Sequence, residues 1–157
     1  MENGFMYDYD QLISVDTFDI YARTRLKEEF SNADDPENEP DSFLCTVQQF
    51  LVDYVNSPSY NNNGFAEIIG TEDEDLDANG LKRKNLFKRA IVHQGMYALK
   101  NGYKYLSDGY DRDKGIIIDL SGIILAPRAE QDLLKAGFLD VKTGDGEPHG
   151  IINGVRY

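Results

Sequence analysis

A long amphipathic helical pattern in the second half of the chain places the strongest constraint on the fold. It runs from about Leu81 to Asn101 and stops at Gly102. Apolar residues recur there at steps of three and four, the spacing of one face of an α-helix. That face carries Leu86 or Phe87, Ala90, Ile91, Gln94, Ala98 and Leu99. Because such a face has to be covered, the pattern favours a bundle of helices.

Two further helical patterns precede the long one. Ser14 or Thr17 can cap the first, a helix of roughly four turns with apolar positions as far as Phe30. Ser42 is expected to cap the second, which ends at Asn56-Ser57-Pro58. Its wide apolar stripe consists of Phe43, Val47, Phe50, Leu51, Tyr54 and Val55.

A short helix is predicted near the end of the chain, over residues 128–136. Pro127 suits its first position, and Gly137 suits its C-terminal stop. Phe138 and Leu139 are expected to fold back on the helix, as in a Schellman motif.

The patterns together predict a mainly α protein, a small four-helix bundle with a short β-hairpin or strand insertion and an extended C-terminal tail. The helical domain covers residues 1–142, and the glycine-rich tail covers 143–157. Isoleucines at 116–118 and 123–124 supply either a hairpin or one bulged strand. The expected core consists of Phe18, Leu26, Phe50, Leu51, Ile91, Leu99, Leu133 and Leu134.

Charge is unevenly distributed along the chain. Residues 31–77 hold twelve acidic and no basic side chains, in a chain with a net charge of −12. Acidic loops are predicted at 31–41 and 70–79, either as solvated surface or as a face directed at a partner. Conversely, cations crowd the start of the long helix: Lys82, Arg83, Lys84, Lys88 and Arg89.

These cations oppose the helix dipole, at a cost of a few tenths of a kcal/mol each. An acidic group should therefore face them, from the preceding loop or from a neighbouring subunit. Phosphates are a less favoured partner, because so acidic a chain repels a nucleic-acid duplex except along one oriented face.

Motifs for chemistry are few. The run from Asp75 to Gly80 begins like a calcium loop, but Lys82 and Leu86 occupy positions eight and twelve, so we expect Asn79 to cap a helix instead. His93 and His149 lack partners at metal-ligand spacing, and nucleotide-binding and hydrolase motifs are absent. The sequence therefore predicts no enzyme and no cofactor.

The cellular setting follows from simple features. Cys45 is the single cysteine, which fits a reducing compartment, and it is expected to be half-buried structure, not a nucleophile. No apolar run approaches the roughly 20 residues of a membrane span. The start of the chain lacks the features of a signal peptide. These features are typical of a soluble intracellular protein.

The order of the segments resembles the head–tail connector (head completion, or adaptor) proteins of tailed bacteriophages. The resemblance covers about half of the chain, residues 14–30 and 82–140. It rests on Tyr21-Ala22-Arg23 and Arg25-Leu26, on the run from Leu86 to Gly102, on Leu125-Ala126-Pro127-Arg128-Ala129 and on the run from Leu133 to Leu139. The long acidic middle and the tyrosine-rich loop at 103–110 depart from the family pattern.

The resemblance implies a structural protein of the virion neck, made in the host cytoplasm. It implies a ring of about twelve copies that closes through one repeated contact. The ring would bind the portal protein on one side and a tail or stopper protein on the other, and DNA would pass through it without specific binding.

Two sets of contact residues follow from this hypothesis. The cations of the long helix would meet Asp34, Asp35, Glu37 and Glu39 of an adjacent subunit. The tail would dock on a partner through Ile151, Ile152, Val155 and Tyr157. The alternative is a small acidic protein whose carboxylates mimic DNA and inhibit a host nuclease, with residues 31–77 as the mimic surface.

Overall fold

The computed structural model describes residues 7–33, 35–101 and 125–142. The protein is mainly helical, with one small antiparallel sheet, so the predicted fold class is confirmed. In chain order the elements are α1 (Val15–Ala22), α2 (Leu26–Glu29), α3 (Glu39–Val55), β1 (Tyr60–Asn61), α4 (Phe65–Gly70), the 3-10 helix η1 (Asp73–Asp75), α5 (Ala78–Lys100), α7 (Pro127–Lys135) and β2 (Asp140–Val141).

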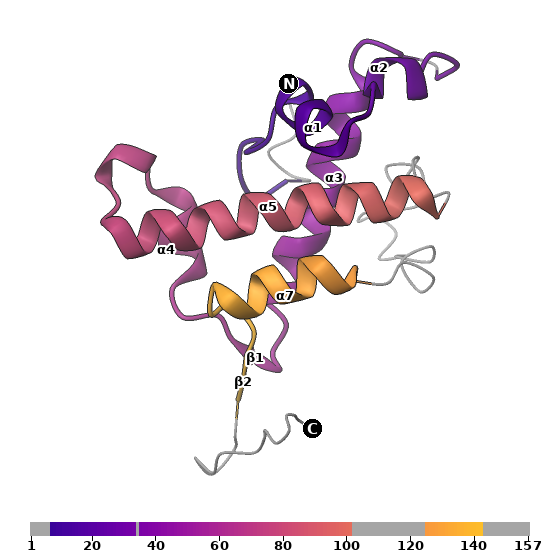
Figure 1. The fold of residues 1–157 in the computed structure, drawn as a ribbon. Helices are drawn as coiled ribbons and strands as arrows, with labels where there is room; N and C mark the ends of the chain where they lie inside the picture. Colours follow the sequence, from indigo (N-terminus) through magenta and orange to yellow (C-terminus); the bar gives the residue numbers. More distant parts are fainter. Residues whose placement is uncertain (1–6, 34, 102–124, 143–157) are drawn as a thin grey trace.

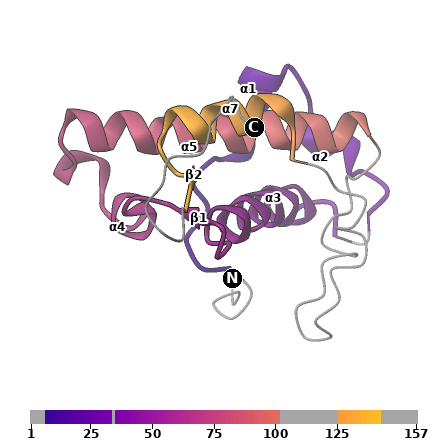
Figure 2. The ribbon, with the colours of Figure 1, turned by 90° about the horizontal axis from the view of Figure 1, so that it is seen from below.

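The long helix α5 is the centre of the structure. In Figure 1, α7 lies along one side of α5 and α1 lies on the other. Helix α3 crosses behind α5, and Figure 2 shows the two as separate layers. None of the helices in the described ranges is both long and apolar enough to cross a membrane.

Helix α7 begins and ends as its sequence predicts. Pro127 stands in its first turn, and Gly137 follows it with φ +81°. Two backbone bonds, from Gly137 to the carbonyl of Leu134 and from Phe138 to that of Leu133, form the Schellman motif. At the other end of α7, the buried Gln94 side chain of α5 accepts a hydrogen bond of 2.7 Å from the Ala126 amide.

The start of α5 differs from the prediction in its cap. Asp77, not Asn79, is the N-cap, and its carboxylate accepts a hydrogen bond of 2.7 Å from the Gly80 amide. A carboxylate is a better cap than an amide here, because it also places negative charge at the positive end of the dipole. The helix therefore begins at Ala78, and the second acidic loop ends two residues earlier than expected.

The single first helix predicted as far as Phe30 is wrong. Ser14 caps α1 as expected, but Arg23 adopts the left-handed conformation with φ 58° and ends it. The Asp19 carboxylate holds this break, because it accepts hydrogen bonds from the Thr24 hydroxyl (2.6 Å) and the Leu26 amide (3.0 Å). The second bond satisfies the first amide of α2, whose N-cap residue is Arg25. Two short helices therefore replace the single predicted one.

The predicted cap of the second helix is also wrong. Helix α3 begins at Glu39, three residues before Ser42, and Pro40 stands in its first turn. Proline is well suited to that position because its missing N–H would have no helical partner there. The end of α3 at Val55, with Asn56 after it, agrees with the prediction.

An extended N-terminal segment, residues 7–13, packs along α3 and is absent from the sequence-based expectations. Gln48 binds its backbone at both Asp10 and Leu12, each at 2.9 Å. Gln49 likewise accepts a bond of 2.8 Å from the Asp8 amide. Both glutamines are almost fully buried, so they serve this segment and not solvent.

The core agrees with prediction except at one position. Phe18, Leu26, Leu51, Ile91 and Leu133 are buried, and Phe50 and Leu99 pack against them half-buried. The prediction for Leu134 is wrong, because its neighbour Leu133 takes the buried position and Leu134 is 53% exposed. Cys45 is buried and not half-buried, 3.6 Å from the Gln11 side-chain oxygen.

The sheet of the structure lies elsewhere than the predicted strands. Tyr60 pairs with Val141 and Asn61 with Asp140, so β1 and β2 join the loop after α3 to the chain after α7. The hairpin or bulged strand expected at 116–125 falls almost entirely outside the described residues. The tail at 143–157 is also outside them.

Candidate functional site

A groove of about 1050 Å³ runs along α5, bordered by α1 and reaching the first turn of α7. Half of its lining residues are apolar. The apolar side chains that line it are Ile13, Tyr21, Ala78, Leu81, Leu86, Val92 and Met96. Tyr21 is 71% exposed, and Met96 is exposed as well, which leaves part of this apolar surface accessible to a partner.

The charged residues that line the groove are all basic. They are Lys82, Lys88, Arg89 and Arg128, and His93 lies among them. Within the part of the chain that the structure describes, no carboxylate lines the groove, although the protein as a whole is strongly acidic. A groove lined by apolar and basic side chains is a surface that fits an acidic segment of another chain.

Two of these cations have no charged partner in the described ranges. Lys82 and Arg128 are exposed and form none of the described ion pairs. The other two are partly engaged, Lys88 with Asp73 at 3.4 Å and Arg89 with Asp132 at 2.8 Å. The groove therefore keeps a positive charge that the fold does not neutralise.

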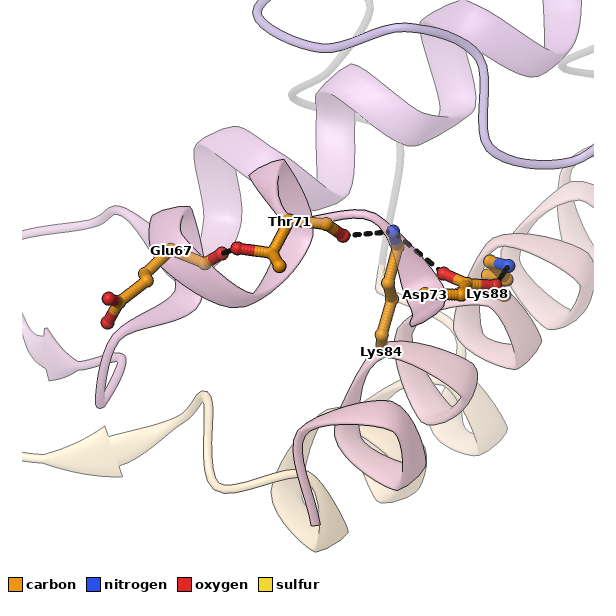
Figure 3. A network of polar contacts seen from close by, with 5 residues as sticks. All are labelled: Glu67, Thr71, Asp73, Lys84 and Lys88. Carbon is orange, nitrogen blue, oxygen red and sulfur yellow. Dashed lines mark hydrogen bonds and ion pairs between the residues drawn. The ribbon is translucent and has the colours of Figure 1, made fainter. Parts of the chain in front are cut away.

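Lys84 lies next to this site in the sequence but does not line the groove. Its side chain is only 8% exposed, and its Nζ donates to the Thr71 carbonyl (2.7 Å) and pairs with Asp73 (2.9 Å). Figure 3 shows Asp73 between Lys84 and Lys88, while the Thr71 hydroxyl donates to the carbonyl of Glu67. The two lysines hold the pKa of Asp73 below its usual value, chiefly through the hydrogen bond from Lys84.

Asp73 is the acidic residue that pairs with Lys84 and Lys88 of the long helix. It belongs to η1 in the preceding acidic loop, as one of the two sequence-based alternatives predicted. Because α5 begins at Ala78, Lys84 and Lys88 lie beyond its first turn, and the dipole cost expected from the sequence is small there. The pairing instead ties η1 to α5. Lys84 is consequently a structural residue and has little surface to offer a second subunit.

The Arg83 side chain is also engaged by groups of its own chain. Its Nε donates to the Ala136 carbonyl (2.6 Å), its Nη2 donates to that of Asn63 (3.0 Å), and its guanidinium lies 4.7 Å from the centre of the Phe138 ring. Partial burial lowers the pKa of this guanidinium, with Asp140 acting in the opposite direction. Arg83 therefore joins α5 to the end of α7 and to the loop before α4.

Asp132 of α7 organises two residues of the groove. Its side chain is 3% exposed and lies between α5 and α7. One oxygen accepts a hydrogen bond from Arg89 Nε (2.9 Å) and lies 2.8 Å from Arg89 Nη2 in an ion pair, and the other lies 2.7 Å from His93 Nδ1. A buried carboxylate of this kind fixes the orientation of both side chains. The sequence offered no signal for it, because 39 and 43 residues separate the partners.

None of the described residues of the acidic segment 31–39 lines the groove. In Figure 1 the turn after α2 is at the upper right, whereas the N-terminal end of α5 is at the left. Asp35 and Glu37 are exposed, Glu39 begins α3, and Asp34 is outside the described residues. The predicted acidic contact residues thus form a surface distinct from the cations that they were expected to meet in another copy.

Neither a metal-binding cluster nor an activated thiol is present among the residues that the structure describes. In residues 7–33, 35–101 and 125–142, no group of three potential ligands is arranged to hold a metal ion. Burial raises the pKa of the Cys45 thiol to about 11, which opposes a reactive thiolate. His149 and the predicted docking residues Ile151, Ile152, Val155 and Tyr157 lie outside the described residues.

Comparison with known proteins found no matching family model, no similar curated protein and no similar solved structure.

Proposed function

We propose that this protein is a structural component of a tailed-bacteriophage virion neck, a head–tail connector that forms a ring between the portal and the tail. One observation carries the proposal. The cationic groove of α5 and the acidic segment 31–39 occupy different surfaces of the same chain. Two different complementary surfaces on one subunit make a head-to-tail contact, which repeats around a ring when the rotation closes.

The fold supports the same proposal. The resemblance implies a long cationic helix followed by a short helix that ends at a glycine, and α5 and α7 are such helices. Residues 102–124, which join them, lie outside the described residues. In the proposal, Lys82, Lys88, Arg89 and Arg128 face the neighbouring subunit, while Arg83 and Lys84 hold the groove in shape.

The partners of the ring follow from the resemblance. The portal protein and a tail or stopper protein would bind its two rims, with the C-terminal tail 143–157 as the docking segment. DNA would pass through the channel without specific binding. A net charge of −12 per subunit suits a channel wall that does not retain DNA.

A genetic experiment tests the proposed function. Inactivating the gene in its phage should leave filled heads without joined tails, and a plasmid copy should restore infectious particles. A copy with Lys82→Glu and Arg128→Glu should fail to restore them. The matched control reverses Lys100 and Lys135, two exposed lysines outside the groove, and should complement. Normal particles in the absence of the protein would refute the proposal.

The acidic-inhibitor alternative rests on a separate observation. Glu72 and Glu74 are exposed, as are Asp35 and Glu37 at the other acidic segment. Such a protein would inhibit a host nuclease in trans and would not be required for joining heads to tails. Nuclease assays with the purified chain distinguish the two functions.

A further inference from the structure

Arg89 lines the groove in an orientation that Asp132 fixes, and it keeps hydrogen-bond donors that Asp132 does not use. Asp132 accepts a hydrogen bond from Arg89 Nε and pairs with Nη2, so at least three of the five N–H groups of the guanidinium are left for a ligand. The side chain is 52% exposed, whereas its partner Asp132 is buried. Asp132 thus fixes the guanidinium on its buried side, and the N–H groups on the exposed side can bind a ligand.

His93 shares this arrangement. Its Nδ1 faces Asp132, and its Nε2 has no hydrogen-bond partner among the residues that the structure describes. Lys82, Lys88 and Arg128 line the same groove. These donors suit a carboxylate ligand, because a guanidinium edge pairs with a carboxylate through two parallel hydrogen bonds.

Among the described residues of the acidic segment, Glu37 has a carboxylate that is exposed and without a described partner. The Asp35 carboxylate accepts a hydrogen bond of 2.9 Å from Asn38, and Glu39 is half-buried at the start of α3. Glu37 is exposed and forms no described hydrogen bond or ion pair. Backbone bonds from Asn38 and Glu39 to the Asp35 carbonyl fix the turn that carries it.

We infer that the Arg89 guanidinium of one copy binds the Glu37 carboxylate of a second copy. The inference rests on the proposed function, since it names the partner of the same groove. Glu37 does not line the groove of its own chain, so the contact joins two different surfaces of two copies. Lys82, Lys88 and Arg128 attract the acidic segment, and the Arg89 fork fixes its position.

Sedimentation velocity of the full chain at low salt provides the first test. Glu37→Lys should weaken self-association at least about tenfold, because it places a cation against a cationic groove. Glu74→Lys is the matched control, since Glu74 is exposed in η1 and has the same charge change. Equal effects of the two substitutions, or no self-association in the unsubstituted chain, would overturn the inference.

A second test examines the guanidinium itself. Arg89→Lys retains the charge and can still pair with Asp132, but it lacks the second edge of the fork. It should weaken association about threefold to tenfold, whereas Arg128→Lys should leave it nearly unchanged. Circular dichroism establishes that both variants are folded. Association unaffected by Arg89→Lys would contradict a specific role for the fork.

Cross-linking locates the contact. In the Arg89→Lys variant a carbodiimide joins a carboxylate to an amine in direct contact, so mixed light and heavy-nitrogen copies should yield a peptide linking positions 37 and 89 of different copies. A link from position 89 to Asp132 within one copy is expected from their pairing and serves as the internal control. Links between copies from position 89 only to acidic residues other than Glu37 would refute the inference. Arg89-dependent binding of an oligothymidylate without self-association would instead assign the groove to nucleic acid.

The two proposals fail separately. A protein found in particles without a contact between positions 37 and 89 would retain the proposed function and lose the inference. If the purified protein forms the contact between positions 37 and 89 but is absent from particles, the inference would be retained and the proposed function would be lost.

Discussion

Phe18 of α1 packs directly on Gly95 of α5, so closely that a Cβ atom at position 95 would lie 2.7 Å from Phe18 Cε1. Both residues are buried, and the contact brings α1 against α5 along one border of the groove. The absence of a side chain at Gly95 therefore sets the separation of these two helices.

Gly95→Ala should destabilise the protein by about 1–3 kcal/mol, because the added methyl group has no room beside a buried aromatic ring. Urea unfolding followed by circular dichroism measures the change. Gly70→Ala is the control, since a Cβ there would meet nothing within 4 Å. An equal or smaller loss at Gly95 would mean that the helices separate without cost.

Gly137→Ala should cost about 1 kcal/mol or more, since φ +81° is unfavourable for a residue with a Cβ. The loss should come from the Schellman motif that positions Phe138 in the core. Thermal unfolding should show a lower midpoint for Gly137→Ala than for Ala136→Gly. The reverse order would contradict the role of this turn.

Asp73→Asn should weaken the anchoring of η1 on α5 and lower stability at neutral pH by a few tenths to about 1 kcal/mol, a modest effect because the carboxylate is 46% exposed. The folded pKa of Asp73 lies below 3.8, so its contribution is present above that value and is lost as the pH falls through the folded pKa. Urea titrations at several pH values should show the difference between the two proteins shrinking in acid. A constant difference would indicate that the charge is not responsible.

Cys45 should react slowly with thiol reagents in the folded protein. Its pKa of about 11, raised mainly by burial, leaves little thiolate at neutral pH. Because the folded pKa exceeds the ordinary value of 9.0, the stabilising contribution is complete below pH 9 and is lost as the pH rises toward 11. Labelling with Ellman's reagent in the presence and absence of urea measures this. Rapid labelling without urea would contradict the burial of the thiol.

Local sequence signals predicted most of the helical framework. Apolar periodicity located α3 and α5, and Pro127 and Gly137 bounded α7, because these signals act within one or two turns. The break at Arg23 was missed because it depends on the side chain of Asp19, which bonds forward to Thr24 and Leu26. Amphipathic spacing alone does not register such a local competitor of the helix.

The groove was only partly predictable. The basic residues near the start of α5 were evident from the sequence. Which of them are engaged within the fold and which stay exposed was not. Asp73 pairs with both Lys84 and Lys88, but Lys84 also donates to the Thr71 carbonyl and is nearly buried, whereas Lys88 stays partly exposed in the groove. Arg89 is oriented by Asp132 from α7. Such pairings across the fold depend on how α7 and η1 pack on α5, which no local pattern encodes.

The most direct test of the central claim is quantitative mass spectrometry of virions purified on a density gradient. The account predicts that this chain bands with intact particles at a low, fixed ratio to the major capsid protein, about twelve copies per particle for one closed ring. A chain that remains among the small soluble proteins of the culture, and is absent from particles, would contradict the claim.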